Sequence, residues 1–266
     1  MFKNIKKIIK VELILIKLNF ESFLFYRLNA LLIFVGSAFY NLGAILFIQF
    51  LFNNITSFAG YDKWDLLLFY GIGQSLGFIY LFSTNPNKYK FVNMVDNGNL
   101  DLILTKPLNS IVYSTLNKFS FEHLIGLIQP VMIIIYVFSN KTYMFNPAGI
   151  IIALSSIFIS IILSHLINVI TLIPTFWLQR QQLYRFYPET ADLSNYPYEI
   201  FDSKISKFIF FILIPYALLV NIPFRSISGD LNTNLFFLEI LVLSFFILTT
   251  KHLWKFGLKN YQSASS

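Results

Sequence analysis

Long, almost uncharged apolar runs recur along this chain, and they restrict its fold more than any other feature. Six of them lie at residues 28–52, 66–83, 119–138, 148–174, 206–223 and 234–250. A helix of about 20 residues crosses the roughly 30 Å hydrocarbon core of a bilayer. Inside that core every backbone polar group needs a partner within the protein, and a helix supplies one. The sequence therefore predicts an all-α, polytopic membrane protein with six transmembrane helices in a single transmembrane domain, residues 1–266.

The supply of charge supports the same class. Only 12% of the residues are charged and 56% are hydrophobic, whereas soluble domains carry about 25% charged residues. A water-soluble chain of this length would lack the polar surface it needs, so a soluble helical domain is excluded.

The basic residues indicate how the spans are oriented. With six spans, 17 of the 20 Lys and Arg residues fall on one side of the membrane, and only Lys63, Lys141 and Arg225 fall on the other. The larger set comprises Lys3, Lys6, Lys7, Lys10, Lys17, Arg27, Lys88, Lys90, Lys106, Lys118, Arg180, Arg185, Lys204, Lys207, Lys251, Lys255 and Lys259. Because basic loops stay in the cytoplasm, both termini are predicted to be cytoplasmic in a bacterial-type cell membrane. The net charge of +7 then reflects topology and gives no support to a nucleic-acid partner.

Residues 1–24 have a pattern of their own. Five lysines between Lys3 and Lys17 recur at helical spacing opposite isoleucines and Phe20, which is typical of an amphipathic helix lying on the membrane surface. A cleaved signal peptide is the alternative, but Glu12 and Lys17 interrupt its apolar region and no small-residue cleavage site follows.

Motifs for catalysis or for cofactor binding are missing from the sequence. The chain has no cysteine and no G-x-x-x-x-G-K-S/T phosphate loop. His123, His165 and His252 lack metal-ligand spacing, although His165, deep in the fourth run, is either a functional group or a hydrogen-bonded core histidine. We therefore expect no enzyme activity, and neither a cofactor nor a metal on this chain.

Polar residues inside the spans admit two interpretations. Asn41, Gln74, Ser75 and Asn221 either line a translocation pathway or hydrogen-bond between helices. Gly73 and Gly77 form a G-x-x-x-G pair, which favours close helix packing. Glu239 is expected near the outer end of the sixth span, with its carboxylate reaching the membrane surface.

The segment between the second and third spans, residues 86–109, is the most informative. Pro86 and Pro107 delimit it, and Gly98 indicates a helix stop. The pattern predicts a short amphipathic helix, a turn, and a second apolar run. So many large apolar residues in a cytoplasmic connection indicate burial against the membrane surface or against a soluble partner.

The stretch from Gly98 to Asn109, GNLDLILTKPLN, resembles the G-x-L/I-D-x-x-L-x-K/R-P-L/I-N/S signature of six-span permease subunits of type-2 ATP-binding-cassette (ABC) transporters, the mostly exporting branch. A second stretch is similar to the same branch: Tyr196-Pro197, Ile200-Phe201, Ile214-Pro215-Tyr216-Ala217 and Ile222-Pro223. Span number, order and orientation agree along the whole chain.

The resemblance implies that residues 86–109 form a coupling helix that docks on a separate cassette ATPase. The docking residues would be Asp96, Gly98, Leu100, Asp101, Ile103, Leu104, Lys106 and Pro107, with Leu100, Ile103 and Leu104 as the apolar centre. For Asp101 a turn-forming role remains open, and for Lys106 a purely topological one.

The resemblance further implies a second permease subunit, identical or a sister chain, and ATP with Mg²⁺ bound on the ATPase partners. Residues 224–233 would close the outer side of the pathway. The segment from Trp177 to Asp202 is expected in the cytoplasm, either among lipid headgroups or on the ATPase. An ATPase-independent transporter or channel is the alternative function. The polar span residues are too generic to select a substrate.

Overall fold

The computed structural model describes residues 2–106, 109–144, 146–178, 196–201, 203–230 and 233–261, with the backbone alone for residues 2–12. These residues form helices, together with one isolated β-bridge between Phe58 and Tyr61. The predicted all-α class is confirmed. The helices are α1 (Phe2–Phe25), α2 (Arg27–Asn54), α3 (Lys63–Ser83), α4 (Asn85–Asp96), α5 (Asp101–Leu104), α6 (Ser110–Thr115), α7 (Glu122–Gly126), α8 (Ile128–Asn140), α9 (Pro147–Leu172), η1 (Ile173–Phe176), η4 (Tyr198–Ile200), α11 (Lys204–Phe208), η5 (Ile209–Leu213), α12 (Tyr216–Ser228) and α13 (Thr233–Asn260).

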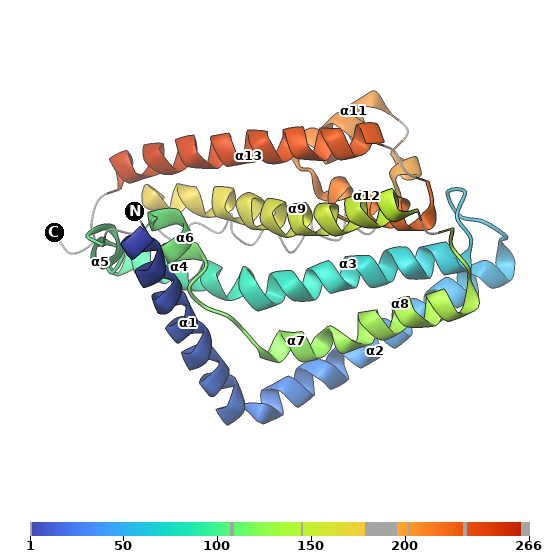
Figure 1. The fold of residues 1–266 in the computed structure, drawn as a ribbon, viewed down its shortest axis with the longest axis horizontal. Coiled ribbons are helices and arrows are strands. Elements are labelled where there is room, and N and C mark those ends of the chain that lie inside the picture. The colour runs from blue at the N-terminus through green and yellow to red at the C-terminus, as the bar shows by residue number, and fades with distance from the viewer. Residues whose placement is uncertain are drawn as a thin grey trace.

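Five helical stretches are long and apolar enough to span a membrane: Arg27–Asn54, Lys63–Asp96, Glu122–Asn140, Pro147–Phe176 and Thr233–Asn260. They agree with five of the six predicted spans, except that residues 119–121 lie in a linker before α7. Figure 1 shows these stretches running along one another in a bundle. We call the end that holds α4, α5, α6 and the last turns of α13 the α4 end, and the opposite end the α11 end.

The predicted fifth span, residues 206–223, is not one straight helix. The helical stretches Lys204–Leu213 and Tyr216–Ser228 meet at 92°. Pro215 has no N–H to donate and disfavours helical backbone in the residue before it, and Ile214 accordingly has φ −130° and ψ 77°. The structure contains either a broken span or a re-entrant segment here, with α11 and α12 both near the α11 end (Figure 1).

The core of the bundle surrounds α12. Tyr216, Ala217 and Leu218 are completely buried, and they belong to a large apolar cluster with residues of α3, α8, α9 and α13. A second, smaller cluster lies at the α4 end, around Phe91, Leu100 and Trp254. The bundle therefore has one packed centre and a separate packed cap at the α4 end.

Glycines bring helices together at positions that the G-x-x-x-G pair did not predict. A Cβ added to Gly71 would lie 2.8 Å from Ile134 Cγ1 and 3.3 Å from the Pro130 carbonyl oxygen of α8. Gly77 is exposed and has open space around it. Gly71 therefore permits close helix approach and Gly77 does not; Gly126, Gly149 and Gly257 have similarly close neighbours.

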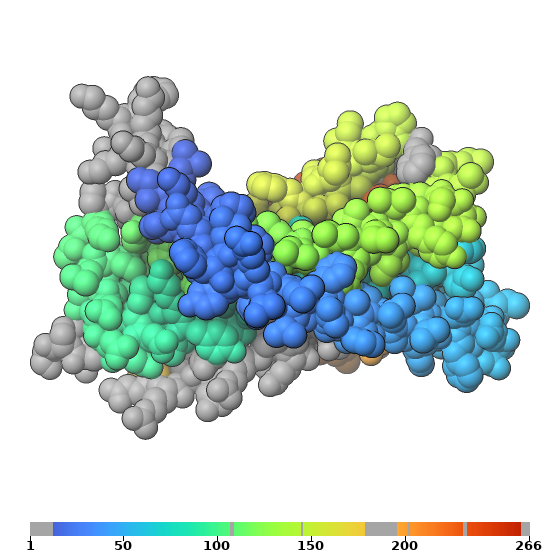
Figure 2. All heavy atoms as spheres, turned by 90° about the horizontal axis from the view of Figure 1, so that it is seen from below, coloured from blue at the N-terminus to red at the C-terminus, as the bar shows by residue number. Residues whose placement is uncertain are grey.

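The outside of the bundle is apolar. Ala30 and Asn41 are the buried residues of α2, and Leu32, Phe39 and Phe50 are 67–72% exposed. In Figure 2 this helix lies along the surface of the bundle, in blue. Apolar exposure on that scale is unsuited to water and typical of a lipid-facing helix.

Helix α1 corresponds to the helix predicted for residues 1–24. It is set across the bundle at the α4 end instead of running along it (Figure 1), and the rings of Phe20 and Phe23 lie 5.3 and 6.5 Å from that of Phe121. Leu13 and Leu18 are more than half exposed. This placement agrees with the predicted interfacial helix, whose position at a membrane surface stays a prediction.

Candidate functional sites at the two ends of the bundle

The predicted helix and turn of residues 86–109 are present at the α4 end. Pro86 lies in the first turn of α4 and has no N–H to donate, so the Phe82 carbonyl accepts from the Ser120 N–H instead, at 2.9 Å. The chain then turns at Gly98, whose φ is +70°, and the Leu100 N–H donates to the Met94 carbonyl at 3.1 Å. The short helix α5 follows. The prediction of a helix, a turn and a second apolar run is therefore confirmed.

The predicted apolar docking centre needs a correction. Leu100 and Ile103 are 0% and 7% exposed, because they pack inside this chain against the aromatic residues of the second cluster. Leu102 and Leu104 are the exposed apolar residues of α5, at 66% and 36%. An amphipathic pattern predicts that one face is buried but not which molecule buries it. We call α5 with its preceding turn, residues 97–104, the tip.

The polar residues of the signature lie around the tip. Asp96 and Lys106 are exposed, and the Lys106 ammonium lies 5.1 Å from the centre of the Tyr113 ring. Asp101 begins α5. Asn109, the last residue of the signature, accepts hydrogen bonds from the N–H groups of Ile111 and Val112 and so caps α6. Pro107 lies outside the described residues.

Through Leu100 and Ile103 the tip belongs to the same apolar cluster as the ends of two long helices. Trp254 of α13 donates from Nε1 to Ser110 Oγ at 3.0 Å. Its ring lies 5.5 Å from that of Phe91 in α4 and 5.1 Å from that of Phe176, which follows α9. A force on the tip therefore reaches α9 and α13 as well as α3.

Asn41 and Asn221 fit the interhelical interpretation. Asn41 of α2 is buried, donates to Gln129 Oε1 at 2.6 Å and accepts from the Tyr70 hydroxyl at 2.7 Å. It thus joins α2, α3 and α8. Asn221 of α12 accepts from the Tyr198 N–H at 2.7 Å and donates to the Tyr196 carbonyl at 3.1 Å, which holds residues 196–198 against the bundle.

The other polar span residues are also placed. Ser75 donates to the Gly71 carbonyl in its own helix, and Gln74 is half-buried on α3. His165 lies within hydrogen-bond distance of the hydroxyls of Thr84 (3.3 Å) and Thr115 (3.2 Å), as expected for a core histidine. Glu239 is fully buried, so the expected reach to the membrane surface is wrong; Ser156 donates to its Oε1 at 2.9 Å.

An ionic cluster stands at the α11 end. Asp62 caps α3 by accepting from the N–H groups of Trp64 and Asp65, and Lys141 Nζ lies 2.8 Å from Asp62 and 2.7 Å from Asp65. Burial raises the pKa of the Asp62 carboxyl, but hydrogen bonds from Lys141 and from the backbone outweigh this effect, so the pKa lies below its usual range. Burial, with the Asp65 charge beside it, raises the pKa of Tyr143.

A second cluster at this end was not foreseen from the sequence. Glu199 accepts from the Tyr61 hydroxyl at 2.9 Å and lies 3.3 Å from Arg225, which also pairs with Asp230. Burial and the hydrogen bond to Glu199 raise the pKa of Tyr61. Because Tyr61 lies between α2 and α3, the cluster connects three segments that are distant in sequence.

This cluster also corrects the predicted topology. Before residue 179 the described chain ends beside the last turns of α13, where the Trp177 ring lies 5.7 Å from that of Phe256. It resumes at Tyr196, whose carbonyl accepts from Asn221 of α12, and α12 lies near the α11 end (Figure 1). Residues 196–201 therefore lie opposite the tip and not beside it. Lys207, whose ammonium lies 4.6 Å from the centre of the Tyr198 ring, and Lys204 in the same helix belong to the α11 end too. Residues 179–195 and Asp202 are outside the described part.

No group of three or more His, Cys, Asp or Glu residues that could hold a metal ion occurs in the described part of the chain. Long apolar helices with lipid-suited surfaces, polar contacts between helices in the interior, and ionic or amphipathic segments at the ends define a multi-pass membrane protein. A comparison with known families matches residues 38–265 to the family described as "ABC-2 family transporter protein". The chain belongs to this family and is an ABC transporter membrane permease with multiple spans. Comparisons with curated proteins and with solved structures find no match.

Proposed function

We propose that this chain is the membrane-spanning subunit of an ATP-driven exporter. Two permease subunits, this chain with a copy of itself or with a sister chain, enclose the translocation pathway, and separate cassette ATPases bind ATP and Mg²⁺. No phosphate loop occurs in the sequence, which supports placing ATP hydrolysis on another polypeptide. Membership of the ABC-2 family supports the same division of labour. We propose no catalytic residue, cofactor or metal for this chain.

The observation that carries this proposal is the tip. Leu102 and Leu104 are exposed on its outer side, while Leu100 and Ile103 are buried in the interior of this chain. Exposed apolar side chains with charged neighbours such as Asp96, Asp101 and Lys106 are typical of a protein interface with an apolar centre and a polar rim. We propose that the ATPase covers this tip.

Packing at the α4 end supplies a mechanical route. Through Leu100 and Ile103 the tip shares an apolar cluster with Phe176, which follows α9, and with Trp254 of α13, and α4 continues α3. Packed helices move as units between discrete arrangements. Movement of the ATPases would thus shift the long helices and switch access to the pathway.

We propose that the α4 end faces the cytoplasm, together with both termini, in a bacterial-type cell membrane. Lys251, Lys255 and Lys259 of α13 and the basic residues of α4 support this orientation. The clusters of the α11 end, including Arg225 and the described part of residues 224–233, would then hold the outer side of the pathway closed.

The test exchanges the exposed apolar residues of the tip. In Leu102→Asp with Leu104→Asp, we expect the chain to insert normally into native membranes but to lose its co-purifying cassette ATPase, as measured by mass spectrometry of the complex in mild detergent. Ile205→Asp is the matched control, because Ile205 is 73% exposed at the α11 end. A complex that survives the double exchange would place the docking site elsewhere. A wild-type chain that purifies without any ATPase would favour an autonomous transporter.

A further inference from the structure

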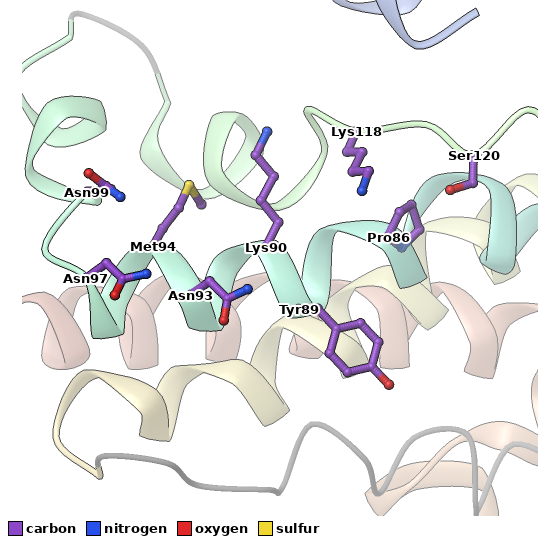
Figure 3. A pocket seen from close by; sticks show the side chains of 9 residues that line it. All are labelled: Pro86, Tyr89, Lys90, Asn93, Met94, Asn97, Asn99, Lys118 and Ser120. Carbon is purple, nitrogen blue, oxygen red and sulfur yellow. The ribbon is translucent and has the colours of Figure 1, made fainter. Parts of the chain in front are cut away.

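A polar depression lies beside α4, on the side that faces the linker 116–121. Its volume is about 490 Å³, and its lining includes Lys90, Asn93 and Asn97 of α4 and its C-terminal turn, and Lys118 and Ser120 of the linker. Figure 3 shows Lys90 extending from α4 toward the linker and Lys118 extending from the linker toward α4. Two ammonium groups from separate segments therefore converge on one space.

The depression is built by a buried clamp. Asn87 is completely buried. Its Oδ1 accepts from the N–H groups of Asn117 (3.0 Å) and Lys118 (2.9 Å), and its Nδ2 donates to the Lys118 carbonyl at 2.8 Å. The Ser120 N–H donates to the Phe82 carbonyl at 2.9 Å. These bonds fix the linker on the junction of α3 and α4, so the position of Lys118 is set before any ligand arrives, which lowers the ordering cost of binding.

The charge of the depression is not balanced by its own lining. Lys90 Nζ donates to Asn117 Oδ1 at 2.7 Å, and among the described residues neither Lys90 nor Lys118 lies within 4.0 Å of a carboxylate. The other polar lining consists of side-chain amides and a hydroxyl. Ammonium, amide and hydroxyl donors around one space are suited to an anion with several acceptor oxygens, of which a phosphate is the common biological example.

A second depression points to the source of that phosphate. It has a volume of about 160 Å³, shares Lys118 and Ser120 with the first, and is lined on its other side by Phe23 and Tyr26 from the end of α1 and the α1–α2 junction. The second depression thus adjoins the cationic one beneath a helix with exposed leucines, and its lining combines the rings of Phe23 and Tyr26 with polar side chains such as Asn19 and Ser22. Glu122 lines only the second depression.

We propose that Lys90 and Lys118 bind the phosphate of an anionic phospholipid headgroup, with the rest of the lipid directed along Phe23 and Tyr26 beneath α1. Basic pockets at the cytoplasmic surface of membrane proteins hold anionic headgroups in this way. The bound lipid fastens α1 to α4, because its headgroup contacts the linker and α4 while its glycerol end contacts α1. Lipid binding by Lys90 and Lys118 does not require an ATPase at the tip, although Asn97 of the lining is also the first residue of the tip.

The test is native mass spectrometry of the purified full-length chain titrated with phosphatidylglycerol, with phosphatidylcholine and with inorganic phosphate. We expect phosphatidylglycerol to bind more tightly than phosphatidylcholine. Lys90→Gln and Lys118→Gln should each weaken phosphatidylglycerol binding about fivefold, since a basic residue near an anionic headgroup contributes about 1 kcal/mol. Lys90→Arg with Lys118→Arg should retain binding. Lys251→Gln with Lys255→Gln, two exposed lysines of the same end, is the matched control and should leave binding unchanged.

Four results would overturn the proposal. Equal affinity for the two lipids, or an equal loss in the α13 control, would show nonspecific attraction to the basic end of the protein. Binding of inorganic phosphate as tight as that of the lipid would assign the site to a soluble anion. Loss of the co-purifying ATPase in Lys90→Gln or Lys118→Gln, with lipid binding unchanged, would assign these two lysines to a protein interface.

Discussion

At the scale of single residues, the sequence identifies which polar groups are buried but not what they contact. Asn41 and His165 were each open to two interpretations, and their partners on neighbouring helices identify them as interhelical contacts. Glu239 was misplaced because its depth along the sixth run says nothing about the direction it faces. Ser156 and Ser160 are four residues apart on one face of α9, and both donate to Glu239 Oε1, at 2.9 and 3.3 Å. The spacing of these two serines was the feature of the sequence that could have predicted a buried polar partner for α9.

The contacts of Glu239 lead to a prediction about stability. Glu239→Gln keeps an acceptor oxygen for the two serines, so we expect its apparent Tm to stay within a few degrees of the wild type. Glu239→Ala removes the acceptor and leaves a cavity, and we expect it to lose about 2 kcal/mol. Tryptophan fluorescence during heating in detergent measures both variants. Equal Tm values for the Ala and Gln variants would contradict the role of the hydrogen bonds.

At the scale of helices, the sequence predicted features that depend on neighbouring residues but not those that depend on residues far away in the chain. Pro86 and Gly98 predicted the start of α4 and the turn after it, because proline and glycine act on the backbone of their own segment. The burial of Leu100 and Ile103 depends on Phe176 and Trp254, which are far away in sequence. Pro215 lies at the break in the fifth apolar run, but the direction of α12 after the break depends on its packing against α3 and α9, which no local pattern encodes.

The turn at Gly98 gives a second prediction, with a control on the same stretch of chain. At φ +70° an added Cβ costs roughly 1–2 kcal/mol, so Gly98→Ala should lower the Tm and loosen the tip. Gly77 lies within α3 with open space around it. There alanine is a better helix former than glycine by about 1 kcal/mol, so Gly77→Ala should leave the Tm unchanged or raise it. Thermal melts of the two variants measure the change in Tm. If both variants lowered the Tm, or both raised it, the argument would be refuted.

At the scale of the whole molecule, a count of basic residues indicates sidedness only when consecutive loops lie on opposite sides of the membrane. The count assumed that residues 177–205 form one loop on one side. The structure instead places Tyr196–Phe201 and α11 at the α11 end, so Lys204 and Lys207 join Lys63, Lys141 and Arg225 there. The remaining described basic residues at the α4 end still favour a cytoplasmic assignment for that end. The family and five of the six predicted long apolar helices could be read from the sequence, because both depend on local composition and a short motif.

Sidedness can be measured directly because the chain contains no cysteine. We predict that a membrane-impermeant maleimide labels Lys204→Cys in intact cells, whereas Lys255→Cys is labelled only after the membrane is opened. Both lysines are exposed, so accessibility within the protein does not separate them. The wild-type chain gives the background. If Lys204→Cys were labelled only after the membrane is opened, α11 would lie on the cytoplasmic side and the prediction would be wrong.

One consequence follows from the near-continuity of α3 and α4, which together form a 34-residue helical stretch from Lys63 to Asp96. At 1.5 Å per residue such a rod is about 50 Å long. If it pivots near one end, a tilt of about 5° displaces the other end by ~4 Å, more than the length of a hydrogen bond. Asp62 and Asp65, with their contacts to Lys141, stand at one end of this lever arm and the tip at the other. A slight rocking of the tip is therefore large enough to break an ion pair on the far side of the membrane.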